Sequence, residues 1–167
     1  MSDWFFMLGE PLSIAEQEQV RGYLEGLGLA REIPIESVPD FDGAARIISH
    51  PEWDRRWWEA EQRERERLRV QATAALGSGP LGQLLSQSTA DGIASSHGAA
   101  AIQAARIGCN DPGLIRAAAG ALSEALYLAE LAEFASAVSS HPFLLKRALF
   151  AGGHWPLGIV AGRFYVF

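Results

Sequence analysis

Apolar residues recur along this chain mainly at helical spacing, and glycine or proline interrupts the pattern between segments. Residues 13–16, Ser-Ile-Ala-Glu, form a capping-box pattern, in which the serine and glutamate side chains each accept a hydrogen bond from the other's backbone N–H. We therefore predict a helix from this point to about Leu27, ended by Gly28. Its expected buried side consists of Ile14, Val20, Tyr23, Leu24 and Leu27.

Four further helices are predicted from the same kind of signal. Proline favours the first helical turn, and the pairs His50-Pro51, Gly79-Pro80, Asp111-Pro112 and His141-Pro142 mark four helix starts. The predicted helices run to about Leu76, Gly108, Val138 and Phe150. The second is rich in alanine, serine and glycine, so we expect it to lie inside the bundle. Residues 30–43 are predicted as an extended connection, with Asp42 capping a short helix that ends at Ile48.

Short apolar runs near both ends of the chain predict strands. Residues 4–8 are aromatic-rich and stop at Gly9, and residues 157–160 and 163–167 flank Ala161-Gly162, a suitable two-residue hairpin turn. An isolated hairpin is marginal in water, so a third strand is needed. The predicted fold is mainly α (α+β): a bundle of about five helices with a small antiparallel sheet formed by the N-terminal strand and the C-terminal hairpin, in one domain spanning residues 1–167.

Composition narrows the functional classes. Hydrophobic residues make up 49% of the chain, which supports a folded core, and the net charge of −6 argues against binding to nucleic acid. The single cysteine, Cys109, excludes an internal disulfide. We find no signal peptide and no apolar run of the ~20 residues that span a bilayer, so we expect a cytoplasmic protein that does not enter a membrane.

Known catalytic and cofactor motifs are not found. The four histidines lack the spacing of a zinc helix, and no glycine-rich loop matches a phosphate-binding motif. We accordingly predict no catalytic residue, no metal and no cofactor. His97 is the exception that keeps an alternative open, because it is a polar residue in an otherwise small, apolar helix, with Glu124 on the next helix as a possible partner. A small helical enzyme or ligand-binding domain with a pocket near His97 is that alternative.

The negative charge is unevenly distributed. Residues 1–45 contain nine acids and two bases, a net charge of −7, and the rest of the chain is close to neutral. Acids gathered in a loop repel one another, whereas a cationic protein partner would stabilise them. We therefore predict partner-binding residues in the acidic segment, namely Glu32, Glu36, Asp40 and Asp42. Trp53, Trp57 and Trp58 do not all fit one helix face, and exposed tryptophan often marks a binding surface, so we add Trp57 and Trp58 to the predicted interface.

The C-terminal block HPFLLKRALFAGGHWPLGIVAGRFYVF, together with the acidic character of the chain, resembles small immunity proteins of bacterial contact-dependent growth inhibition systems. Such proteins are compact, often acidic cytosolic proteins that bind and block a toxin domain. The class shares no common site, so the resemblance assigns no functional residue. It implies a non-enzymatic protein-binding module that neutralises a basic toxin domain, and a third possibility, a scaffold or oligomerisation domain, rests on the small-residue helices.

Overall fold

The computed structural model describes residues 4–167, apart from the side chains of residues 88, 89, 91, 92 and 95. Its helices are η1 (Trp4–Met7, a 3-10 helix), α1 (Ile14–Gly26), α2 (Phe41–Ile48), α3 (Arg55–Leu76), α4 (Ser78–Ile107), α5 (Pro112–Phe134) and α6 (Pro142–Ala151). The strands are β1 (Ile35–Ser37), β2 (Trp53–Asp54), β3 (Pro156–Val160) and β4 (Arg163–Val166). The prediction of a mainly helical chain with a small sheet is confirmed.

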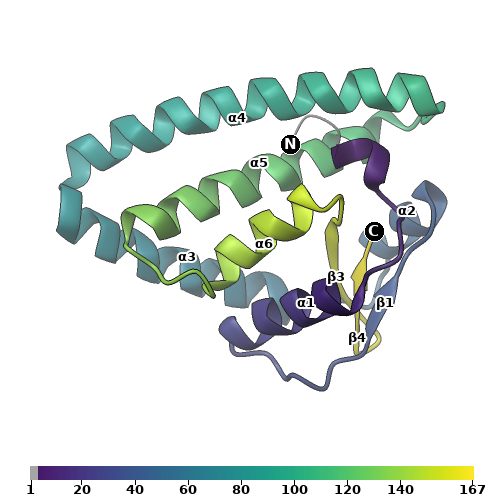
Figure 1. Cartoon of the computed structure of the whole chain (residues 1–167), viewed down its shortest axis with the longest axis horizontal. Helices are drawn as coiled ribbons and strands as arrows, with labels where there is room; N and C mark the ends of the chain where they lie inside the picture. The colour runs from purple at the N-terminus through teal and green to yellow at the C-terminus, as the bar shows by residue number, and fades with distance from the viewer. Residues whose placement is uncertain (1–3) are drawn as a thin grey trace.

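The long helices lie roughly alongside one another, and the sheet packs at one end of them (Figure 1). Helix α5 is central: it contacts α3, α4 and α6, and α6 in turn contacts α1. One core cluster joins α1, α3, α6 and the sheet around Leu24, Leu68 and Phe143. A second joins η1, α2, α4 and the first half of α5 around Trp4, Leu122 and Phe150.

Most helix boundaries follow the predicted caps. The capping box of Ser13 and Glu16 is present, and Asp111 and His141 cap α5 and α6 through hydrogen bonds from nearby backbone N–H groups. The end of α3 at Leu76 is also confirmed. Two starts were wrong. The helix predicted at His50-Pro51 begins at Arg55, with Asp54 as its cap, and α2 is capped by Asp40 rather than Asp42.

The predicted composition of the sheet needs correction. The hairpin of β3 and β4 is present, with Ala161 and Gly162 both at positive φ, as a type I′ turn requires. Residues 4–7, however, form a 3-10 helix and not a strand, because consecutive Trp4 and Phe5 are both buried and so do not alternate between two faces.

Two short strands from the middle of the chain complete the sheet instead. The strand order is β1-β4-β3-β2, with β1 parallel to β4 and the other pairs antiparallel. Strand β1 lies in the segment predicted to be an extended connection, and β2 lies where helix was predicted. The sheet is therefore mixed and four-stranded.

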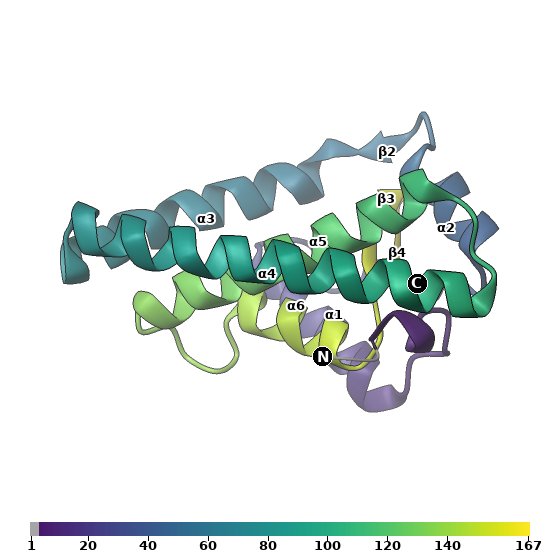
Figure 2. The ribbon, with the colours of Figure 1, turned by 90° about the horizontal axis from the view of Figure 1, so that it is seen from above.

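Helix α4 does not lie inside the bundle. It packs along α5 on one side, with Leu81, Leu85 and Ala100 buried, and its other side is open to solvent (Figure 2). Leu84, Ile93 and Ile102, three apolar residues of this helix, are between 42% and 59% exposed. Ile14 of α1, predicted to be buried, is 83% exposed. Small residues allow close helix packing but do not require it on every side, which explains the difference.

Candidate functional site

The predicted acidic segment lies on the surface between α1 and α2. Glu32 is exposed in the turn before β1, and Glu36 lies on β1 in an ion pair with Arg163 of β4. Asp40 and Asp42 are exposed at the start of α2. Oδ1 of Asp40 accepts a hydrogen bond from the Gly43 N–H at 2.6 Å and so caps the first turn of α2. Asp40 therefore also has a structural role.

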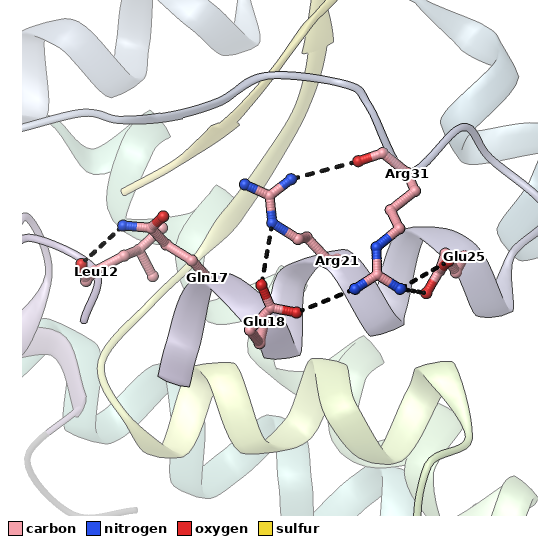
Figure 3. A network of polar contacts seen from close by, with 6 residues as sticks. All are labelled: Leu12, Gln17, Glu18, Arg21, Glu25 and Arg31. Carbon is pink, nitrogen blue, oxygen red and sulfur yellow. Dashed lines mark hydrogen bonds and ion pairs between the residues drawn. The ribbon is translucent and has the colours of Figure 1, made fainter. Parts of the chain in front are cut away.

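The acids of α1 are neutralised within the protein. The Arg31 guanidinium contacts the Glu25 carboxylate at 3.0 and 3.1 Å and the Glu18 carboxylate at 3.4 Å (Figure 3). Arg21 contacts Glu18 at 3.4 Å and donates a hydrogen bond to the Arg31 carbonyl, also at 3.4 Å. These contacts join α1 to the loop that follows it. Glu18 and Glu25 therefore do not contribute to the unpaired negative charge that could attract a cationic partner.

Ion pairs leave a smaller set of acids without a cationic partner. Within residues 4–45, the acids that form no ion pair are Glu10, Glu32, Asp40 and Asp42. Three of these four belong to the predicted interface. The fourth predicted acid, Glu36, is in an exposed pair, and such pairs contribute little to stability. The unpaired negative charge is therefore concentrated before and at the start of α2.

A depression of about 530 Å³ adjoins α2, at the turn between α4 and α5. Asp42 and Asp111 both contribute to its lining, together with the apolar side chains of Phe41, Ile107 and Leu114. Oδ1 of Asp111 accepts two hydrogen bonds from the first turn of α5. We call this site the α2 depression. It places two carboxylates beside an apolar wall.

The two predicted tryptophans differ in exposure. Trp58 is 45% exposed, whereas Trp57 is 7% exposed and belongs to the core, so the placement of Trp57 in a partner interface was wrong. The reason lies in its polar contact: the Trp57 indole N–H donates to the Tyr23 hydroxyl at 2.6 Å. Trp53 is on β2, and its indole N–H donates to the Leu157 carbonyl at 3.1 Å.

Sequence reasoning missed a buried ionic cluster between α1, α3 and α6. The Glu61 carboxylate accepts from the Tyr23 hydroxyl at 2.6 Å and from the Lys146 ammonium at 2.7 Å. Glu61 and Lys146 are 2% and 3% exposed. Burial raises the pKa of Tyr23 well above its ordinary value, and the charge of Glu61 adds to this effect. The cluster ties three helices together but is closed to solvent.

A second buried pair lies at the start of α6. His141 Nδ1 accepts a hydrogen bond from the Phe143 N–H at 3.2 Å, so in the neutral ring the proton is on Nε2. Nε2 lies 2.7 Å from Glu64 Oε1. Burial lowers the pKa of His141, and this effect exceeds the opposing influence of Glu64. Both ring nitrogens are satisfied by protein groups. His141 therefore caps α6, at the helix start predicted from His141-Pro142.

His97 lines a depression of about 480 Å³ between α3, α4 and α5, which we call the α4–α5 depression. Glu124 lines it too, but no hydrogen bond joins Glu124 to His97. The alternative hypothesis required such a cavity beside His97, and that requirement is met. The described residues that line it are Arg65, Ile93, His97, Gly120, Ser123, Glu124 and Tyr127.

No family model, curated protein or solved structure matches this chain. Among the residues that the structure describes, no group of three or more His, Cys, Asp or Glu side chains is arranged to hold a metal ion. Within the same residues, no helix is both long and apolar enough to cross a membrane.

Proposed function

We propose that this protein is a non-enzymatic binding module for a cationic protein, of the kind represented by the immunity proteins that block toxin domains. The observation that carries the proposal is the unpaired acidic surface at α2. Glu32, Asp40 and Asp42 form no ion pair with any side chain that the structure describes, while the neighbouring acids of α1 do. Binding a cationic partner requires no chemical step from this protein.

The α2 depression offers a contact for a basic side chain. Lysine and arginine carry an apolar stem and a charged head, so they pack against apolar walls while the head reaches carboxylates. Phe41 and Leu114 supply such a wall, and Asp42 and Asp111 supply the carboxylates. Both acids lie in the first turn or cap of a helix, where the helix dipole offsets part of their charge. We expect Glu32, in the turn before β1, to add to the electrostatic attraction of the partner.

Exposed charges of this kind act mainly on the rate of association. Their attraction to a partner is screened beyond a Debye length of about 8 Å at physiological ionic strength. A partner bound through this surface should therefore associate faster at low salt, and the dissociation rate should change less. Trp58, the more exposed of the two predicted tryptophans, stays in the proposed interface, and Trp57 does not.

The test compares two charge-reversed proteins as baits in a lysate of the native host. One carries Glu32→Lys and Asp42→Lys, which spares the cap at Asp40. The matched control carries Glu66→Lys and Glu133→Lys, which change the net charge equally at two exposed carboxylates of α3 and α5.

We expect the wild type and the control to retain one basic protein that salt elutes, and the α2 variant to retain much less of it. Association rates measured with the purified partner should fall by about tenfold or more for the α2 variant alone. Equal retention by all three proteins, or equal loss in both variants, would show that the acidic surface is not the binding site.

A further inference from the structure

The α4–α5 depression has a lining unlike that of the α2 surface, since it combines both charges with apolar groups. Four of its residues lie on one face of α5, at positions 120, 123, 124 and 127, which are spaced as successive turns of a helix. Ile93 and His97 come from α4, and Arg65 comes from α3. The volume of about 480 Å³ falls within the range of small-molecule sites.

Its charged groups are not paired with each other. Arg65 lies over the ring of Tyr127, with 5.0 Å between the guanidinium carbon and the ring centroid. No ion pair joins Arg65 to Glu124, although both line the same depression. Ser123, by contrast, already has a hydrogen-bond partner within the protein. Its hydroxyl bonds to the Ser96 hydroxyl at 2.6 Å, which joins α4 to α5. The serine pair therefore forms a fixed polar part of the wall.

We propose that this depression binds a small zwitterion: a free α-amino acid with an apolar side chain. A purely anionic ligand would meet the Glu124 carboxylate, and a purely cationic one would meet Arg65. A molecule with both groups satisfies both residues at once. Arg65 receives the ligand's carboxylate in the paired geometry that a guanidinium favours, and Glu124 accepts from its ammonium group.

The remaining lining fits the rest of such a ligand. Ile93 is 45% exposed on the side of α4 that borders the depression, and it offers an apolar contact together with the Tyr127 ring. His97 adds a ring nitrogen for a hydrogen bond to the ligand carboxylate. Gly120 leaves the space open, since a Cβ built there would meet no atom within 4 Å. A larger side chain at position 120 would fill the depression without disturbing the core.

The test uses L-phenylalanine and L-leucine as probes, with 3-phenylpropionate and phenethylamine as analogues that each lack one charged group. Binding to the whole protein is measured by calorimetry and by NMR titration. Removing a hydrogen-bonded charge commonly changes affinity by about tenfold to hundredfold. We expect at least one amino acid to bind the wild type more tightly than either analogue. Arg65→Gln and Glu124→Gln should each weaken its binding by that factor.

Two glycine variants separate occlusion of the site from loss of folding. Gly120→Leu should abolish amino-acid binding, and Gly98→Leu on the open side of α4 should not, since a Cβ at either position meets nothing within 4 Å. Both changes should raise the melting temperature, because glycine disfavours a helix interior. Saturable binding of neither amino acid to the wild type, or unchanged binding to Gly120→Leu, would overturn the proposal.

Discussion

The buried ion pair between Lys146 and Glu61 allows a sharp prediction about stability. Lys146→Met removes the ammonium and leaves the Glu61 carboxylate, 2% exposed, with the Tyr23 hydroxyl as its one hydrogen-bond partner among the described residues. Breaking such a pair on one side costs about 3–5 kcal/mol, because a buried charge is left uncompensated. For a chain of this size, 1 kcal/mol shifts the melting temperature by about 2–4 °C, so we expect a fall of about 6–20 °C.

The next residue along α6 provides a matched control. Arg147 pairs with Glu133 at 2.7 Å, but these side chains are 35% and 50% exposed. Arg147→Met should therefore cost at most about 1 kcal/mol. A second change, Glu61→Gln in the Lys146→Met background, should recover a large part of the lost stability, since the amide oxygen can still accept from Tyr23 without a charge.

The measurement is urea denaturation of the four proteins at neutral pH. Equal stabilities of Lys146→Met and Arg147→Met would refute the inference that this pair is desolvated.

Three further predictions concern single residues. Gly158→Ala should lower the free energy of unfolding by about 1–3 kcal/mol, measured by urea denaturation, and Gly162→Ala should lower it less. Both glycines have positive φ, but only at position 158 would a Cβ lie 2.5 Å from the Trp53 indole nitrogen. Hydrogen bonds from Ser13 lower the pKa of Glu16 from 4.5 to about 2. Because the pKa of Glu16 is lower in the folded state than in the unfolded state, its ionised carboxylate stabilises the fold. The stability difference between the wild type and Glu16→Gln should therefore be complete above pH 4.5 and disappear towards pH 2, measured by acid denaturation. Asp111→Ala should lower stability by about 1 kcal/mol through loss of the α5 cap, measured by thermal denaturation, and Asp111→Asn should lower it less.

Helix boundaries could be predicted because the signals are local. The side chains that cap α1, α5 and α6 lie within three residues of the N–H groups they satisfy, so adjacent residues contain the whole interaction. The hairpin turn at Ala161-Gly162 is equally local. Strands β1 and β2 have only three and two residues, too few for a visible alternation, and their partners lie far away in the sequence.

In the candidate sites, too, features set by neighbouring residues could be predicted, and features set by residues distant in the sequence could not. Exposure of the acidic segment could be expected from its charge. That Trp57 is buried and Trp58 is exposed depends on where Tyr23 lies, 34 residues earlier in the chain. The Glu61–Lys146 contact joins residues that are 85 positions apart, and each alone resembles a surface charge. His97 could be singled out as unusual, but the depression beside it is made by three helices together.

The inner position of β4 has a consequence for folding kinetics. This last strand pairs with β3 beside it in the sequence and with β1, where Ile35 pairs with Phe164, 129 positions later in the sequence. Closing so long a loop is entropically costly, and contacts between distant residues slow folding. Helices α3, α4 and α5 can associate through nearer contacts first. The β1–β4 pairing is then expected to form late, so substitutions there should act mainly on the unfolding rate.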